Sequence, residues 1–447
     1  MKKGSKKALF GTDGIRTKFG NFPLDPSSII RIGRCLSESV NPQRVLIGRD
    51  TRISGLEIES LLKEGLGDKP EILCTGIIST PALSYQMVNN SFELGIMITA
   101  SHNIWYDNGI KLFGSEGEKF SGELQNRIEE MFYSDKEFSI STVKRKSVVF
   151  DASEKYIDFV VSNFSGFNRK IPDIILDCAN GSVSDIAPEI FSRLGIKHVA
   201  YNIYPDGKNI NKECGSTELD FLRQRISAGE GSLGIAFDGD GDRVLMVDDS
   251  GNNIDGDCIL FIISKYLKEY EPDFNPVVVG TMMSNLFLEK ALEKNGVKFI
   301  RSDVGDRFVY KNMKKNFAIL GGEQSGHIIY SKLQKTGDGI VSSLLFLKAI
   351  LFLNISASDI LNIYKPIPQV TLNIEIKKKR PLEDWDELNL MIENFYRKNG
   401  NNSRILIRYS GTENKIRLMI ESEDKKVTNK YIKIFRDFLL SEIGGEK

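Results

Sequence analysis

The apolar positions of the chain form strand-sized runs that alternate with amphipathic stretches, and this pattern occurs three times. Each apolar run is followed by a polar turn and then by apolar residues three or four positions apart. The runs lie at 45–48, 174–177 and 277–280, and the amphipathic stretches at 54–66, 182–194 and 284–293. Such spacing is typical of a helix that packs one face on a sheet. We therefore predict three copies of one strand–helix unit.

Each copy continues with a second apolar strand and, after another helical stretch, with a third. The second strands are predicted at 71–75, 197–203 and 298–301, and the third strands at 94–98, 233–237 and 317–320. The runs are nearly continuously apolar, as is required of strands that are covered on both faces. Strands that alternate with helices indicate a mainly parallel sheet.

The pattern changes after residue 365. The runs 404–408 and 416–420 alternate apolar and polar residues, and an amphipathic helix is predicted at 427–440. The predicted fold class is therefore α/β: three similar α/β domains with mixed, mainly parallel sheets, plus a smaller C-terminal α+β domain, around a central cleft. The predicted domains are 1–150, which carries a candidate serine, 151–253 for metal binding, 254–365 for sugar binding and 366–447 for phosphate binding.

Composition narrows the class of protein. The 447 residues carry 60 basic and 60 acidic side chains, so no charge excess favours nucleic acid as a partner. The basic start is not followed by a long apolar run, so we expect no signal peptide. Residues 340–355 come nearest to a membrane span, but polar residues interrupt them and a buried helix is expected. Five scattered cysteines without a Cys-x-x-Cys pair favour a reducing, cytoplasmic location.

Polar loops follow all three predicted third strands. These loops comprise residues 99–103, 238–243 and 321–327. Ligands of open α/β sheets bind beyond the carboxyl ends of the strands. Three equivalent loops therefore indicate one shared cleft.

Asp238, Asp240 and Asp242 alternate with glycines in the second of these loops. In an extended segment every second side chain points the same way, so the three carboxylates are expected to converge. Like charges repel unless a cation lies between them, and carboxylate oxygens suit Mg²⁺. Two alternatives are a calcium-binding EF-hand loop, which the positions of Arg243 and Asp249 disfavour, and a plain Asp-Gly turn.

Ser101 lies in the first of these loops, beside His102. A serine hydroxyl is a poor nucleophile unless it is activated, and most serines at strand ends are turn residues or helix caps. No Gly-x-Ser-x-Gly motif surrounds it, which disfavours a hydrolase. Together with the aspartates, Ser101 becomes a candidate phosphate carrier whose oxygen completes a metal shell.

Two further loops combine groups that suit a sugar phosphate. Glu323, Ser325 and His327 place a carboxylate, a hydroxyl and an imidazole close together; the alternative is a glycine-rich turn. The fourth loop offers hydroxyls, a glycine and arginines, which can bind an anion; the alternative is an ordinary hairpin turn. Its candidate residues are Arg408, Ser410, Gly411, Thr412 and Arg417. Arg16, beside two glycines, and Lys111 are weaker candidates, and an exposed lysine is the alternative for Lys111.

The motifs 10–16, 99–103, 238–243, 323–327 and 410–413 stand in the order seen in the α-D-phosphohexomutases, and the chain resembles that family over nearly its whole length. The segments 209–211, 214–217, 304–307 and 336–339 resemble the bacterial branch that acts on glucosamine phosphates. One departure is Ile104, which stands where the family often has proline.

The resemblance implies roles for individual residues. It implies a phosphoserine at Ser101 and one Mg²⁺ per chain, held by that phosphate with Asp238, Asp240 and Asp242. It implies a general acid/base at Lys111, with His102 nearby, and charge supplied by Arg16 and Arg243. The implied substrate-binding residues are Gly305, Asp306, Arg307, Glu323, Ser325 and His327 for the sugar, and Arg408, Ser410, Gly411, Thr412 and Arg417 for its phosphate.

The implied activity is interconversion of glucosamine 6-phosphate and glucosamine 1-phosphate through a bisphosphorylated sugar. Mannose or glucose phosphates are the alternative substrates. Two different classes of protein stay open beside a mutase: a phosphatase and a non-catalytic sugar-phosphate-binding protein. The expected partner is a small-molecule sugar phosphate, with no nucleic acid and no membrane, and a homodimer is kept open beside a monomer.

Overall fold

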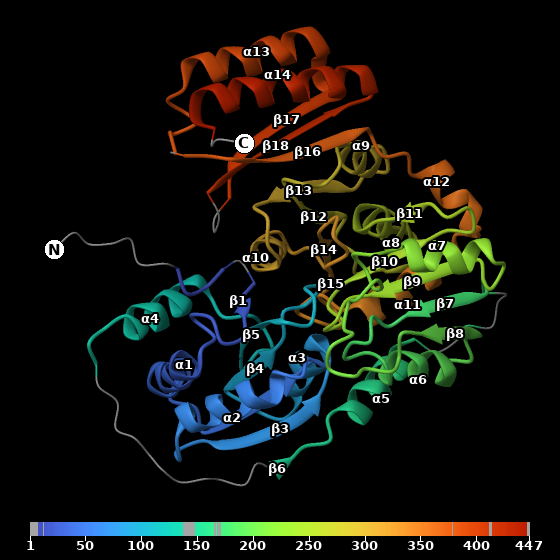
Figure 1. The fold of residues 1–447 in the computed structure, drawn as a ribbon. Coiled ribbons are helices and arrows are strands. Elements are labelled where there is room, and N and C mark those ends of the chain that lie inside the picture. The colour runs from blue at the N-terminus through green and yellow to red at the C-terminus, as the bar shows by residue number, and fades with distance from the viewer. Residues whose placement is uncertain are drawn as a thin grey trace.

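The computed structural model describes residues 8–11, 13–136, 148–164, 167, 171–377, 379–410 and 414–444. Four sheets follow one another along the chain, and we call each sheet with its helices a unit. In Figure 1 the first unit (blue) lies at the bottom left, the second (green) at the lower right, the third in the middle and the fourth (red) at the top.

The first unit has a six-stranded sheet in the order β1-β5-β4-β2-β3-β6. Its elements are β1 (Ile15–Lys18), α1 (Pro26–Val40), β2 (Arg44–Arg49), α2 (Gly55–Leu66), β3 (Glu71–Ile77), α3 (Thr80–Asn89), β4 (Leu94–Ile98), β5 (Asp107–Gly114), α4 (Gly122–Phe132) and β6 (Val148–Val149). Side-chain caps start several helices: Asp25 accepts from Ser28 N before α1, and Ser79 accepts from Ala82 N before α3.

The second unit has a five-stranded sheet in the order β11-β10-β9-β7-β8, and the third has four strands in the order β13-β12-β14-β15. The second contains α5 (Ser153–Asn163), β7 (Ile174–Asp177), α6 (Ile186–Arg193), β8 (His198–Tyr201), α7 (Asp220–Ser227), β9 (Leu233–Phe237), β10 (Val244–Val247) and β11 (Asn253–Ile254). The third contains α8 (Gly256–Tyr270), β12 (Val277–Thr281), α9 (Leu286–Lys294), β13 (Lys298–Ser302), α10 (Asp306–Asn316), β14 (Leu320–Gly322), β15 (Ile328–Tyr330), α11 (Gly339–Phe352), the 3₁₀ turn Ala357–Asp359 and α12 (Ile360–Ile363).

The three sheets share one arrangement. In each, the first strand of the repeat pairs in parallel with the second and the third, and a fourth strand returns antiparallel to the third. The predicted threefold repeat with mixed, mainly parallel sheets is therefore confirmed. The carboxyl ends of β4, β9 and β14 carry the polar loops, which places those loops at equivalent edges of the three sheets.

The fourth unit is smaller and its sheet is wholly antiparallel, in the order β16-β18-β17. It contains β16 (Gln369–Glu375), α13 (Asp386–Asn399), the 3₁₀ turn Gly400–Asn402, β17 (Ser403–Tyr409), β18 (Lys415–Ser422) and α14 (Lys425–Ile443). The predicted α+β class of this unit is confirmed. The domain boundaries at 150, 253 and 365 stay predictions.

One predicted strand was misplaced. The prediction put the third strand of the third repeat at 317–320, whereas β14 is Leu320–Gly322. Phe317 instead ends α10 in the left-handed conformation, at φ 53°, and its ring is 82% exposed. An apolar residue in the cap of a helix was thus mistaken for the start of a strand. Gly321 and Gly322 consequently belong to the strand and not to the loop.

The hydrophobic core explains why the loops are held firmly. A single cluster of buried side chains runs through the first three units, including Leu46, Tyr156, Ile259 and Leu344. The fourth unit has its own core around Trp385. No single helix in the described ranges meets the length and hydropathy needed to cross a membrane; α11 and α12 meet it only together, across a 92° bend.

Candidate active site

The serine loop lies at the carboxyl end of β4. Ser101 is wholly buried and adopts the left-handed conformation at φ 53°. Its N–H donates to Thr99 Oγ1 at 2.8 Å, and its Oγ donates to Asp238 Oδ2 at 2.6 Å. The hydroxyl also lies 3.4 Å from His102 Nδ1. The structure therefore joins the candidate nucleophile directly to the aspartate cluster.

The three aspartates converge, although not by the predicted mechanism. The segment after β9 is a tight turn in which Gly241, at φ 72°, donates its N–H to Asp238 O at 3.0 Å. One oxygen from each of Asp238, Asp240 and Asp242 lies within 4.8 Å of the others. The prediction of an extended segment was wrong because the glycine reverses the backbone. A Cβ on Gly239 would lie 2.7 Å from Ser101 O, so this turn also needs glycine to approach the serine loop.

This cluster fits a divalent cation. All three carboxylates are buried, and Asp240 Oδ1 has no hydrogen-bond partner. Burial, followed by the charges of Asp240 and Asp242, raises the pKa of Asp238 to about 8. A buried carboxylate oxygen without a partner is costly unless a cation takes it as a ligand. The trio could therefore hold a metal ion that prefers oxygen ligands.

Lys111 on β5 reaches the same cluster. Its Nζ lies 2.6 Å from both Asp240 Oδ2 and Asp242 Oδ2, and the side chain is 1% exposed. Burial alone lowers the pKa of Lys111, but Asp13, Asp240 and Asp242 together raise it well above its ordinary value. In this arrangement Lys111 keeps its proton, so it can donate hydrogen bonds and stabilise negative charge. The alternative of an exposed lysine is excluded.

His102 differs from Lys111 in charge. Burial, with the nearby charges of Arg243 and Arg16, lowers the pKa of His102 to about 3. The ring is therefore neutral near pH 7. A neutral imidazole nitrogen 3.4 Å from Ser101 Oγ can accept a hydrogen bond there, and the lowered pKa makes the ring a weak base.

Asp13 joins several cations beside β1. It pairs with Arg16 and Lys119, and its Oδ2 lies 3.5 Å from Lys111 Nζ. Burial alone raises the pKa of Asp13, but Lys111, Lys119 and Arg16 together lower it below its ordinary value. Arg16 Nε is buried without a hydrogen-bond partner, which leaves it available to an anion.

The third unit closes this network. Asp306 pairs with Lys119, and its Oδ2 lies 3.4 Å from His327 Nε2. His327 Nδ1 lies 3.5 Å from Asp242 Oδ1, and Gly337 N–H donates to His327 Nε2 at 3.0 Å. The charges thus form a ring through three units. Asp306 and His327, predicted to bind the sugar, also join the third unit to the loop 238–243, which we call the metal loop.

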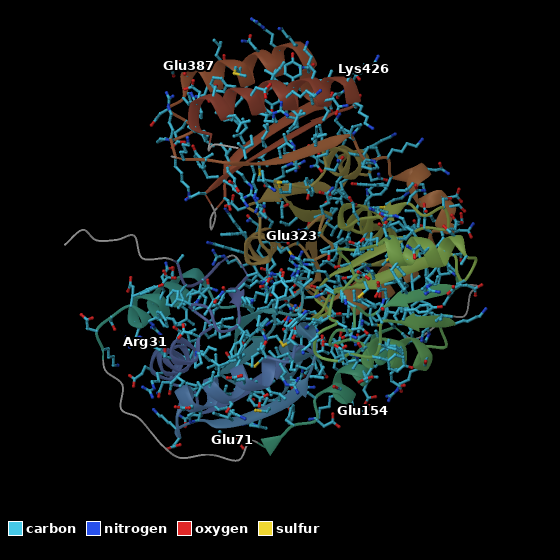
Figure 2. The ribbon with its side chains drawn as sticks, viewed as in Figure 1. Arg31, Glu71, Glu154, Glu323, Glu387 and Lys426 are labelled. Atoms are coloured by element: carbon cyan, nitrogen blue, oxygen red, sulfur yellow. The ribbon has the colours of Figure 1, made fainter. Side chains whose placement is uncertain are left out.

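A cavity of about 270 Å³ lies beside the aspartate cluster. Its lining includes Arg243 from the second unit and Gly305, Glu323 and Ser325 from the third. Gly305 N–H donates to Glu323 Oε1 at 3.0 Å, which fixes the carboxylate at the cavity wall. Figure 2 labels Glu323 in the middle of the molecule, where the third unit faces the first. The cavity is lined by the hydrogen-bonding groups that a sugar requires.

Arg243 and Arg307 are placed differently. Arg243 lines the cavity, its N–H donates to Asp238 Oδ1 at 3.1 Å, and its Nε is buried without a hydrogen-bond partner. Arg307 instead donates from Nη1 to Gln125 Oε1 at 2.9 Å and lines a separate cavity against α4. The structure therefore does not bring Arg307 together with the other predicted substrate-binding residues.

The fourth unit carries the predicted phosphate loop. Arg408 on β17 stands opposite Arg417 on β18. Burial and the charge of Arg417 lower the pKa of Arg408, and Arg408 Nε is buried without a hydrogen-bond partner. Ser410 is buried beside them, whereas Gly411 and Thr412 lie outside the described residues. Two facing arginines repel each other, and an anion bound between them offsets this repulsion.

Sequence reasoning missed several residues that contact this site, namely Asp50, Arg52 and Lys119, and it noted Asn211 only within the segment 209–211 without giving it a role. Asp50 and Arg52 follow β2, at the same edge of the sheet as the serine loop, so the rule applied to the third strands could have found them. Lys119 and Asn211 lie in loops between elements, and no periodic pattern marks them.

Comparisons with known proteins agree with this geometry. Family models for the phosphoglucomutase/phosphomannomutase α/β/α domains I, II and III match residues 7–138, 154–251 and 255–367, and the model for the C-terminal domain matches residues 372–437. The phosphoglucosamine mutase of Histophilus somni (strain 129Pt) is 39% identical over 430 residues, which cover 95% of this chain and 96% of that protein. The phosphoglucosamine mutase of Cronobacter sakazakii (strain ATCC BAA-894) is 40% identical over 432 residues, with coverage of 94% and 96%.

Solved structures share the fold at lower identity. A phosphoglucomutase/phosphomannomutase family protein from Burkholderia thailandensis aligns with a TM-score of 0.79 and 20% identity over 98% of this chain and 99% of that one. The N-acetylphosphoglucosamine mutase of Aspergillus fumigatus, in complex with GlcNAc-6P and magnesium, aligns with a TM-score of 0.70 and 16% identity over 98% and 97%. With four matching domain models in order along the chain and relatives near 40% identity over almost its full length, this chain belongs to the phosphoglucomutase/phosphomannomutase family.

Proposed function

We propose that this chain is a phosphoglucosamine mutase that interconverts glucosamine 6-phosphate and glucosamine 1-phosphate. The observation that carries the proposal is the 2.6 Å contact between Ser101 Oγ and Asp238 Oδ2 within a buried trio of aspartates. The relatives near 40% identity bear the name phosphoglucosamine mutase and favour an amino sugar as substrate.

Ser101 carries the phosphoryl group in this proposal. The bond between phosphorus and Ser101 Oγ breaks while a bond to sugar O1 or O6 forms. The proton of the sugar hydroxyl passes to a nearby base, and Ser101 Oγ takes up a proton and becomes a hydroxyl. The bisphosphorylated sugar then turns over in the cavity and returns its other phosphoryl group to Ser101 Oγ. The phosphoserine is regenerated at the end of each cycle, so the isomerisation consumes no phosphate donor. The same two half-reactions also run in reverse.

The aspartate trio would hold Mg²⁺, and the bound ion would supply positive charge beside the transferring phosphoryl group. Lys111, which keeps its proton, and Arg243 stabilise negative charge there. The proposed proton acceptor is His102, on the geometric ground that its Nδ1 lies 3.4 Å from Ser101 Oγ.

The remaining loops hold the sugar. At the cavity wall, the carboxylate of Glu323 accepts hydrogen bonds from the sugar hydroxyls, and the hydroxyl of Ser325 donates or accepts them. Arg408 and Arg417 bind the phosphate that does not react, together with Ser410, Gly411 and Thr412. Because either phosphate must occupy this place after the intermediate turns over, a separate phosphate-binding unit suits the reaction.

A coupled assay tests the proposal. We expect the purified chain with Mg²⁺ and a catalytic amount of glucosamine 1,6-bisphosphate to form glucosamine 1-phosphate from glucosamine 6-phosphate. We expect slower turnover of glucose 6-phosphate and mannose 6-phosphate. Faster turnover of either hexose phosphate would reassign the substrate, and release of inorganic phosphate without isomerisation would indicate a phosphatase.

A further inference from the structure

The guanidinium of Arg52 holds the serine loop from within the first unit. The side chain is wholly buried. Its Nε donates to Asp50 Oδ2 at 2.8 Å, and its other N–H groups donate to backbone oxygens. These acceptors are Ser101 O at 2.9 Å, Asn103 O at 2.7 Å, Asp107 O at 3.0 Å and Ile104 O. All five donors of the guanidinium are therefore used, and four of them fix one loop.

Asn211 holds the same loop from the second unit. Its Nδ2 donates to Ser101 O at 2.8 Å and to Asn103 O at 2.9 Å. The carbonyl oxygen of Ser101 thus accepts hydrogen bonds from two units at once. A shift of one unit against the other would strain this shared acceptor, so the two contacts also fix the serine loop relative to the metal loop.

Asp50 orients the whole arrangement. Its carboxylate accepts from Arg52 N at 3.0 Å and from Thr99 Oγ1 at 2.7 Å, and Thr99 Oγ1 in turn accepts from Ser101 N–H. The N–H and the C=O of Ser101 are therefore both tied to one buried network. A non-glycine residue in the left-handed conformation costs free energy and persists only where its surroundings hold it. No proline stands between residues 101 and 107, so hydrogen bonds and not covalent geometry fix this loop.

We infer that Arg52 and Asn211 are positioning residues for phosphoryl transfer, an inference that rests on the proposed function. They touch the backbone of Ser101 and not its Oγ, so they do not take part in the chemistry itself. Their role is to aim Ser101 Oγ at Asp238. A reacting atom misplaced by about 1 Å can slow a reaction by about 100-fold. Loss of either contact is therefore expected to lower kcat more than it raises KM.

The chain offers a matched control for each residue. Arg31, on α1, also binds backbone carbonyls through its guanidinium, with Nε donating to Phe132 O at 2.6 Å at the end of α4, and its acceptors are not in the serine loop. Asn209 lies two residues before Asn211 and donates to Tyr204 O at 2.9 Å. Arg31→Lys and Asn209→Ala remove comparable contacts away from Ser101.

The experiment compares Arg52→Lys and Asn211→Ala with these two controls and with the wild-type chain. It measures kcat and KM for glucosamine 6-phosphate, and the single-turnover rate of phosphoryl transfer from the phosphorylated enzyme to glucosamine 6-phosphate. We expect both variants to lose about 10–100-fold in kcat and in the single-turnover rate, with KM within about threefold. Both controls are expected to keep wild-type rates. Circular dichroism and thermal unfolding identify any variant that does not fold.

Wild-type rates in both Arg52→Lys and Asn211→Ala, or losses no larger than those of the controls, would overturn the inference. A rise in KM with kcat unchanged would overturn it too, because substrate binding and not transfer would then be affected. If Arg52→Lys does not fold, Asn211→Ala alone decides. A wild-type chain without mutase activity would refute the proposed function instead, so the two failures are distinguishable.

Discussion

Binding of Mg²⁺ to the metal-free protein is expected to release a proton from the aspartate trio. Burial and the neighbouring carboxylates raise the pKa of Asp238 to about 8, and because the three groups interact this value belongs to the trio. At pH 7 roughly nine tenths of the metal-free molecules then hold this proton. A carboxylate must lose its proton to bind the ion. We therefore expect about one proton released per Mg²⁺ at pH 7.

The same reasoning sets the pH dependence of affinity. Below about pH 8 the ion competes with one proton, so the apparent affinity for Mg²⁺ should rise about tenfold per pH unit between about pH 6 and pH 8 and then level off. The stability of the metal-free protein should change in the opposite sense. The folded protein holds a proton that the unfolded chain has lost above about pH 4, so this group alone lowers the free energy of unfolding by at most about 1.4 kcal/mol per unit as pH rises from about 4 to 8.

Isothermal titration calorimetry in two buffers of different ionisation enthalpy measures the released proton directly. Asp238→Asn removes the titrating ligand and should abolish the release, whereas Asp249→Asn, on an exposed turn beyond β10, should leave it unchanged. Proton release near zero at pH 7, or an affinity that does not vary between pH 6 and pH 8, would refute the reasoning.

Three other perturbations test separate parts of the site. Lys111→Met removes the ammonium group that lies between Asp240 and Asp242. By chemical denaturation it should lower the free energy of unfolding by about 3–5 kcal/mol in EDTA and by less in Mg²⁺. An equal loss in both conditions would contradict a site shared by the lysine and the ion. Gly239→Ala places a Cβ 2.7 Å from Ser101 O and should cost about 1–3 kcal/mol of stability together with most of the mutase activity; full activity at unchanged stability would show that the two loops are not fixed in contact. Arg408→Lys should raise KM about 10–100-fold with little change in kcat, because the paired hydrogen bonds of an arginine to phosphate are lost; an unchanged KM would remove Arg408 from the phosphate site.

The sequence predicted the repeated part of the fold well because buried strands carry a strong local signal. The runs that became β4, β7 and β9 are wholly buried and almost wholly apolar, so their bounds could be placed closely. The misplaced strand at 317–320 failed because Phe317 is apolar but exposed in a helix cap. Hydrophobicity alone does not distinguish these two situations, since the conformation of a cap depends on backbone angles.

The site was partly predictable for a similar reason. Ser101, Asp238 and Glu323 follow equivalent strands of three separate sheets, so the repeated topology places each of them at the carboxyl edge of its own sheet. Lys119, Asp306 and His327 meet only because the first and third units pack together, and nothing local in the sequence encodes that contact. Arg307 also contacts another unit, since its guanidinium donates to Gln125 of α4; its role at the sugar stays a prediction.

The most direct test of the central claim is to locate the transferred phosphoryl group. The wild-type chain is incubated with glucosamine 1,6-bisphosphate and digested, and mass spectrometry identifies the modified peptide; mutase turnover is measured in parallel for wild type and Ser101→Ala. We predict the added mass of one phosphoryl group on the peptide that contains Ser101, its disappearance on incubation with glucosamine 6-phosphate, and no turnover by Ser101→Ala. A phosphoryl group on another residue, or a Ser101→Ala variant with wild-type turnover, would contradict the account.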